Sequence, residues 1–142
     1  MIKQNIVFVE NKAGSLKRVT GLLANNNINI YGFACFDAPE FAIFRMICDD
    51  PDKAEIILNQ SGYMNRITQA IVVDMKDQVG GLDELLKMMA DSNVSLDYIY
   101  TSFHRKGLRP VVILHSEDIT VTESVLKNNG FKVFSAADEL EK

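Results

Sequence analysis

The sequence predicts an α+β protein in which one βαββαβ unit occurs twice, each copy forming an antiparallel sheet with both helices on one face. Two observations predict this fold. The chain aligns on itself over most of its length, and each half alternates short β-branched or aromatic runs with segments of helical periodicity. The 142 residues allow two small units. Units of roughly 70 residues bury little surface alone, so we expect the two units to pack against each other.

The internal repeat extends through both halves of the chain. The copies share a glycine-containing loop before the first helix, apolar second and third strands, and a glycine after the second helix. The second copy has a short insertion in the turn before its third strand, where insertions are tolerated. We therefore predict two domains, over residues 1–69 and 70–142. The aligned segments are 11–16 on 77–82, 27–30 on 93–96, 43–46 on 111–114 and 62–63 on 130–131.

In the first copy, the loop and helix signals follow the expected order. Gly14 ends a loop, and Ser15 can cap the helix that follows. Asp50 and Pro51 begin the second helix, where proline removes no backbone hydrogen bond, and Gly62 ends it. The predicted elements are strands 5–9, 28–36 and 41–48, helices after residues 14 and 50, and a fourth strand that runs into the second copy near 70–75.

The second copy repeats this order up to the last strand. Its first helix is marked by apolar residues at helical spacing from Leu82 to Met89, and its last helix by those from Val121 to Leu126. The charged tail, residues 136–142, is expected to fray. The predicted strands are 94–103, 111–115 and 131–134.

Alternation along the second strand predicts an uncovered apolar face. Ile28 and Ile30 would face the helices, whereas Tyr31, Phe33 and Cys35 would lie on the opposite face. Exposed apolar area of that size usually marks an interface. We therefore expect the two copies to pair and two chains to form a homodimer through sheet or helix faces.

Composition excludes several classes of protein. With 47% hydrophobic and 24% charged residues, the chain has the balance of an ordinary globular protein. No apolar run approaches the ~20 residues of a membrane helix, and the N-terminus has no signal-peptide pattern, so a cytoplasmic location is expected. The net charge is −4 and the basic residues are scattered, which argues against nucleic-acid binding.

The sequence offers no convincing catalytic or metal site. Cys35 and Cys48 are expected to be reduced and buried. Because the sequence has no Cys/His cluster, we expect no metal ion or other cofactor. The triplet 104–106, His-Arg-Lys, is expected at a solvated hairpin tip. Because His115 stands isolated on a strand and no paired carboxylates converge, we do not expect an enzyme.

The repeated loop-and-helix pattern resembles the ACT domain, a family of small regulatory modules that are fused to, or partner, enzymes of amino-acid metabolism. The pattern is Asn-x-x-Gly-x-Leu before a helix, then an Asn-Ile pair on the next strand. It reads NKAGSL at 11–16 and NINI at 27–30, then DQVGGL at 77–82 and NVSL at 93–96. The resemblance covers nearly the whole chain and implies a ferredoxin-like fold in a stand-alone tandem ACT protein.

The physics of the helix entrance supports the amino-acid ligand that the resemblance implies. A helix N-terminus offers unpaired N–H groups and the positive end of its dipole to a carboxylate. Asn11 and Asn29 match ligand-binding asparagines of regulatory domains similar to that of phosphoglycerate dehydrogenase, and an Asp in place of Asn11, as at Asp77, is also seen in aspartokinase-like ACT domains. The candidate ligand-binding residues are Asn11, Ala13, Gly14, Ser15, Leu16 and Asn29 in the first copy and Asp77, Val79, Gly80, Gly81, Leu82 and Ser95 in the second.

Simpler roles stay open for these residues. Gly14 and Gly80 could be only helix-entry turns, and Asn11 and Asp77 could be loop caps. Sequence alone also cannot separate an amino-acid-binding allosteric regulator from a ligand-independent subunit that docks on a biosynthetic enzyme such as acetolactate synthase. An RNA-recognition module shares the element order, but the third strands lack its basic and aromatic signature.

Overall fold

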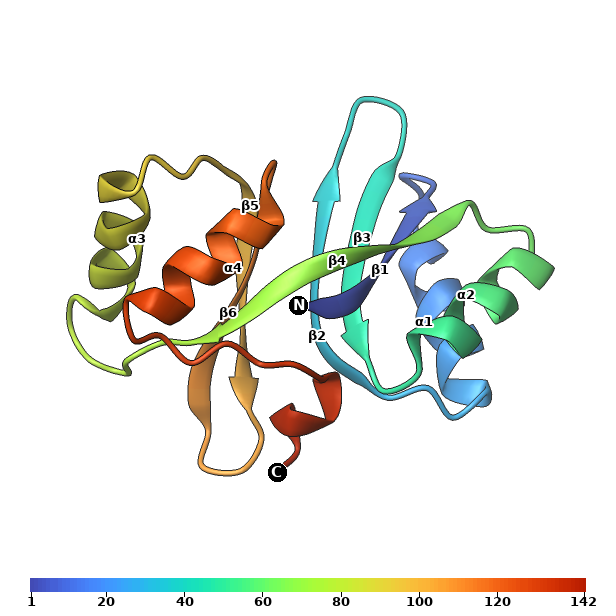
Figure 1. Ribbon diagram of the computed structural model, residues 1–142. Coiled ribbons are helices and arrows are strands. Elements are labelled where there is room, and N and C mark those ends of the chain that lie inside the picture. Colours follow the sequence, from blue (N-terminus) through green and yellow to red (C-terminus); the bar gives the residue numbers. More distant parts are fainter. The chain divides into compact units, whose positions relative to one another are not determined.

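The computed structural model describes residues 1–142 (Figure 1). The fold is α+β, and the predicted order of elements is confirmed except at the C-terminus. Hydrogen bonds join the strands in the order β2-β3-β1-β4-β6-β5. No helix combines the length and apolar character needed to cross a membrane. The elements are β1 (Ile2–Val9), α1 (Ser15–Asn25), β2 (Ile30–Asp37), β3 (Ala42–Cys48), α2 (Pro51–Gln60), β4 (Asn65–Asp74), α3 (Gly81–Asp91), β5 (Leu96–His104), β6 (Arg109–Ser116), α4 (Ile119–Asn128) and the 3₁₀ helix η1 (Ala137–Leu140).

The chain divides into two compact units. One comprises Lys3–Thr68, and the other comprises Gln69–Lys142 together with Met1–Ile2. Strand β4 contains the point at which one unit gives way to the other, so no separate linker connects them.

In the unit Lys3–Thr68, both helices cover the same face of the strands. Strand β3 pairs antiparallel with β1 and with β2. Residues of α1 and α2 share one buried core with residues of β1 and β3, which confirms the predicted placement of both helices on one face. The core residues are Val7, Val9, Val19, Leu23, Ile28, Phe44, Met46, Cys48, Ala54 and Leu58.

A β-bulge in β2 corrects the predicted alternation. The register between β2 and β3 shifts between Ile30 and Gly32, so residues after the bulge change faces. Phe33 therefore lines the same apolar groove as Ile30, beside α1, and its ring contacts that of Phe44 with 6.1 Å between the centroids. The prediction that Phe33 lies on the face opposite Ile30 was wrong, because the extra residue at the bulge reverses the in–out pattern. The Phe33 side chain is nevertheless 61% exposed, whereas Tyr31, which was also expected on an uncovered face, is buried.

The other unit repeats the arrangement. Strand β6 pairs antiparallel with β4 and β5, and the register with β5 shifts between Leu96 and Tyr98, the position equivalent to the bulge in β2. Helices α3 and α4 share a core with β4 and β6. The core residues are Ile71, Val73, Leu85, Met89, Val112, Leu114 and Leu126.

The C-terminus departs from the prediction. The expected strand 131–134 is reduced to a single bridge between Val73 and Val133. The following residues form η1, in which Leu140 is completely buried and its carbonyl accepts a hydrogen bond from the Arg105 amide at 2.8 Å. The tail is therefore docked, not frayed, because one apolar side chain and one backbone hydrogen bond anchor it.

Three polar residues also differ from expectation. Cys35 is exposed and only Cys48 is buried, because β2 is an edge strand; both are free thiols. His104 is buried, with its ring against Phe134. His115 is not isolated, since its Nδ1 lies 2.7 Å from a carboxylate oxygen of Asp97.

Candidate functional site

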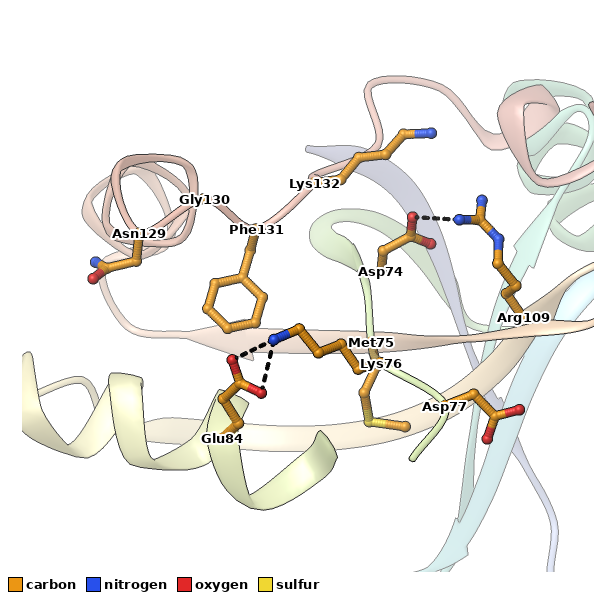
Figure 2. A pocket seen from close by; sticks show the side chains of 10 residues that line it. All are labelled: Asp74, Met75, Lys76, Asp77, Glu84, Arg109, Asn129, Gly130, Phe131 and Lys132. Carbon is orange, nitrogen blue, oxygen red and sulfur yellow. Dashed lines mark hydrogen bonds and ion pairs between the residues drawn. The ribbon is translucent and has the colours of Figure 1, made fainter. Parts of the chain in front are cut away.

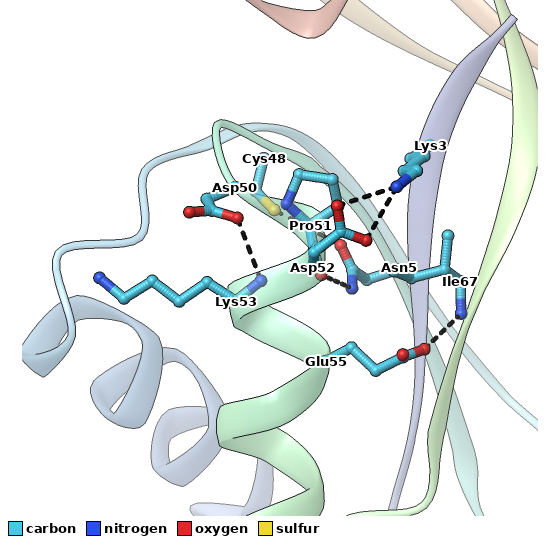
Figure 3. A network of polar contacts seen from close by, with 9 residues as sticks. All are labelled: Lys3, Asn5, Cys48, Asp50, Pro51, Asp52, Lys53, Glu55 and Ile67. Atoms are coloured by element: carbon cyan, nitrogen blue, oxygen red, sulfur yellow. Dashed lines mark hydrogen bonds and ion pairs between the residues drawn. The ribbon is translucent and has the colours of Figure 1, made fainter.

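The four α-helices begin in two different ways, and the difference follows the repeat. The second helix of each unit is closed by aspartate. Asp50 Oδ1 accepts a hydrogen bond from the Lys53 amide at 3.0 Å, and Asp118 Oδ1 accepts one from the Val121 amide at 3.1 Å. Figure 3 shows the Asp50 cap together with the polar contacts that surround the start of α2. In each of these helices an aspartate side chain of the chain itself satisfies one of the first amide donors.

The first helix of each unit begins after a glycine that offers no side-chain cap. Gly14 and Gly80 have φ angles of 81° and 84°, in the left-handed region that favours glycine. The first N–H groups of a helix have no partner inside it. The entrances of α1 and α3 therefore present backbone donors and the positive end of the helix dipole, the arrangement that suits an anion.

The loop before α1 is held by short-range hydrogen bonds. The Ser15 amide donates to the Lys12 carbonyl at 3.2 Å, and Asn11 Nδ2 donates to the Ala38 carbonyl at 3.1 Å. The Asn11 amide nitrogen thus ties the loop to the turn after β2. The side-chain oxygen of Asn11 is a hydrogen-bond acceptor that takes no part in this contact.

A cavity of about 360 Å³ lies beside the start of α1. Above Gly14, the Arg18 guanidinium lies 3.5 Å from the position that a Cβ would occupy, and it donates to the Ser15 hydroxyl at 3.1 Å. Strand β1 and the turn after α2 supply the other walls. The lining residues are Phe8, Val9, Glu10, Ser15, Arg18, Gly62, Tyr63 and Met64.

A cavity of about 380 Å³ lies at the repeat-equivalent place beside α3 (Figure 2). Here the Lys76 ammonium forms an ion pair with Glu84 at 2.9 Å, and Asp74 lies 3.5 Å from Arg109. The lining residues are Asp74, Met75, Lys76, Asp77, Glu84, Arg109, Asn129, Gly130, Phe131 and Lys132.

Gly81 explains why the loop before α3 can turn tightly. A Cβ on this residue would lie 2.1 Å from the carbonyl oxygen of Lys76, too close for any side chain. The backbone of the loop therefore approaches the helix start closely. Val79 and Leu82, which flank this approach, are exposed, at 104% and 46%.

Each unit brings together only part of its predicted site. Residues 11–16 and 77–82 lie at the helix entrances, whereas Asn29 and Ser95 precede the next strands, beyond the opposite helix ends. An 11-residue helix separates the two ends by about 16 Å. Asn29 lies beside α2, where its amide donates to Asp49 Oδ1 at 3.0 Å. Ser95 lines a separate cavity of about 210 Å³ near the start of α4.

Sequence reasoning missed the charged residues of the two cavities. Under the repeat register, Glu10 aligns with Lys76 and Arg18 with Glu84, so both positions exchange their charge between the copies. That signal was visible in the aligned sequence. The glycines after the second helices, Gly62 and Gly130, were aligned but received no site role, although both line a cavity.

The fold and these helix entrances define a duplicated βαββαβ protein with one glycine-opened helix start in each copy. A family model of the ACT domain pair matches residues 1–142, so the chain belongs to that family. Protein BT0572 from Bacteroides thetaiotaomicron has a similar structure, with a TM-score of 0.89 and 28% sequence identity over 99% of this chain and 96% of that one.

Two further structures share the fold. The regulatory subunit of aspartate kinase from Thermus thermophilus, in its ligand-free form, has a TM-score of 0.62 and 14% identity over 90% of this chain and 91% of that chain. The corresponding subunit from Thermus flavus has a TM-score of 0.58 and 14% identity over 89% and 91%. No curated protein sequence matches this chain.

Proposed function

We propose that this ACT domain pair is a cytoplasmic regulatory protein of amino-acid metabolism that binds a free amino acid and catalyses no reaction. One observation carries the proposal. Both first helices begin at glycine without a side-chain cap, whereas both second helices are closed by aspartate. Because aspartate caps the second helices and no side chain caps the first helices, backbone N–H donors at the start of α1 and α3 are available to an external carboxylate.

The loop residues take defined roles in this proposal. The ligand carboxylate meets the amides at the start of α1 or α3, where Gly14 and Gly80 leave room for close approach. The ligand ammonium meets the oxygen of Asn11 or the carboxylate of Asp77. The latter is a charge-assisted contact, of a kind that contributes about 1.5–3 kcal/mol.

Asn29 and Ser95 have a different place in the proposal. Because they lie beyond the opposite ends of α1 and α3, they cannot contact the ligand of their own unit's loop. We propose that in a homodimer they complete the loop of another ACT module, following the resemblance to phosphoglycerate dehydrogenase. A ligand that contacts two modules favours one packing of them, and this shifts the population towards that packing.

The named relatives support a regulatory role. The two similar Thermus proteins are regulatory subunits of aspartate kinase. By analogy, the partner of this chain is an enzyme of amino-acid biosynthesis whose activity follows the bound ligand.

The test is thermal unfolding of the full chain with each of the twenty free amino acids. A ligand present at a hundredfold excess over its Kd stabilises the folded state by about 2.7 kcal/mol, so at least one amino acid should raise the melting temperature. The same amino acid with its carboxyl group amidated is the control and should give no shift. Twenty unchanged melting temperatures would refute ligand binding and favour ligand-independent docking on an enzyme.

A further inference from the structure

Helix α1 and strand β2 border an apolar groove of about 390 Å³ that is open to solvent. Strand β2 stands first in the strand order and pairs only with β3. Because an edge strand leaves one row of its backbone groups unpaired, an apolar groove beside it is a surface on which another chain can pack. We call this surface the α1–β2 face, and its residues are Leu16, Lys17, Thr20, Ile30, Phe33 and Phe44.

The same surface recurs in the other unit, beside α3 and β5. Strand β5 stands last in the strand order, and its β-bulge is at the position equivalent to that of β2. Leu82, Leu86 and Ile99 expose their side chains here. One chain therefore has two exposed apolar surfaces, each beside an edge strand. The repeat register gives the residues of this α3–β5 face as Leu82, Asp83, Leu86, Leu96, Ile99 and Val112.

The two faces differ in charge. Helix α1 has two basic residues and no acidic one, whereas α3 has three acidic residues and one lysine. Lys17 is at the position equivalent to Asp83, and neither residue forms an ion pair within its unit, since the other acidic residues of α3, Glu84 and Asp91, take the lysines. The one acidic residue of β2, Asp37, is the last residue of that strand. Contact between unlike faces is therefore favoured over contact between like faces.

The two faces also differ in shape. Thr20 and Gly21 of α1 are equivalent to Leu86 and Lys87 of α3, so α1 has short side chains where α3 has long ones. The groove of the α1–β2 face can receive an apolar side chain, and the exposed Leu86 of the α3–β5 face offers one. Two α1–β2 faces placed together would leave both grooves unfilled, which close-packed interfaces avoid.

We infer that two copies of this chain associate by contact between the α1–β2 face of one copy and the α3–β5 face of the other. Because each chain carries both faces, a two-fold symmetric dimer uses this contact twice. The inference rests on the homodimer of the proposed function and specifies which faces meet in it. It requires no bound ligand.

Sedimentation velocity of the full chain without added amino acid tests this inference. The wild type should associate. Phe33→Asp and Leu86→Asp each place a carboxylate in the apolar contact, so each should raise the dissociation constant of the dimer at least tenfold. Ile56→Asp is the matched control, because Ile56 is 56% exposed but lies on α2, outside both faces; its dissociation constant should equal that of the wild type.

Mixing the two variants distinguishes contact between unlike faces from contact between like faces. An equimolar mixture of Phe33→Asp and Leu86→Asp retains one intact contact, between the α3–β5 face of the first and the α1–β2 face of the second. A 1:1 complex should therefore form, although each variant alone is monomeric. If like faces met, only one of the two variants would dissociate, and mixing would not restore its association.

That result, or a monomeric wild type, would overturn the inference. Circular dichroism checks that the variants fold. Lys17→Glu changes only an exposed side chain of the α1–β2 face, so it replaces Phe33→Asp if that variant is unfolded, with the same expected results. The melting temperatures with the twenty amino acids test ligand binding separately. An amino acid that stabilises a monomeric wild type would refute this inference alone, whereas restored association with twenty unchanged melting temperatures would refute ligand binding alone.

Discussion

Replacing Leu140 by alanine tests the docking of the C-terminal tail. The Leu140 side chain is completely buried, although it lies only two residues from the end of the chain. The substitution removes three carbon atoms from the core while the carbonyl group that binds the Arg105 amide is retained. The change therefore isolates the contribution of the side chain.

The expected cost follows from burial. Each buried carbon group contributes about 0.8 kcal/mol, so the transfer term is roughly 2.4 kcal/mol. Leucine-to-alanine changes in cores cost about 2–5 kcal/mol, and a terminal segment can relax, so we expect about 2–3 kcal/mol. The entropy of unfolding is about 2.1 cal/mol/K per residue, which gives about 0.3 kcal/mol/K for 142 residues. Dividing the expected loss of stability by this entropy gives a fall in Tm of about 7–10 °C.

Differential scanning calorimetry of the full chain measures this fall. Lys142→Ala is the control, because its side chain is 74% exposed and its ion pair with Asp138 is of a kind that contributes little. Its Tm should equal that of the wild type. A fall of less than about 2 °C in Leu140→Ala would show that the tail is not anchored as described.

Two further predictions concern the thiols and the loop before α3. Burial raises the pKa of Cys48 to about 12, so this thiol stays protonated at pH 8. A thiol reagent should therefore modify only the exposed Cys35 in the folded protein and both cysteines in denaturant. Modification of both cysteines without denaturant would contradict this prediction. Gly81→Ala should lower the free energy of unfolding in urea more than Gly80→Ala, because its new Cβ would collide with the Lys76 carbonyl oxygen. A Cβ on Gly80 would meet open space, and the cost there is that of a left-handed φ, roughly 1–2 kcal/mol for alanine. An equal or smaller loss for Gly81→Ala would refute the reasoning.

The repeat and the helix entrances could be predicted from sequence because their signals are local. Glycine at the entrance, apolar residues at helical spacing, and Asp-Pro at the start of α2 act within a few residues of each other. The bulge in β2 depends on pairing with β3, and its local signal is weak. Gly32 follows Tyr31, and an isolated glycine inside a strand can mark a bulge, but glycine alone does not fix the register of the two strands.

The remaining differences also arise from long-range contacts. Leu140 belongs to a charged tail whose composition is typical of a frayed end, yet tertiary packing buries it. His104 lies in a basic triplet but packs on Phe134, far along the chain. In the candidate site, motif matching grouped Asn29 with Gly14, although α1 separates them; the charge exchange at Arg18 was available in the alignment but matches no motif.

The continuity of β4 determines how this protein can be dissected. Its ten residues, Asn65–Asp74, include the change from one unit to the other, between Thr68 and Gln69. A cut at the domain boundary that we propose, between residues 69 and 70, would interrupt this strand and would also separate Met1–Ile2 from the unit to which they belong. Fragments meant to fold alone should therefore both carry residues 65–74, so that the shared strand is duplicated instead of severed.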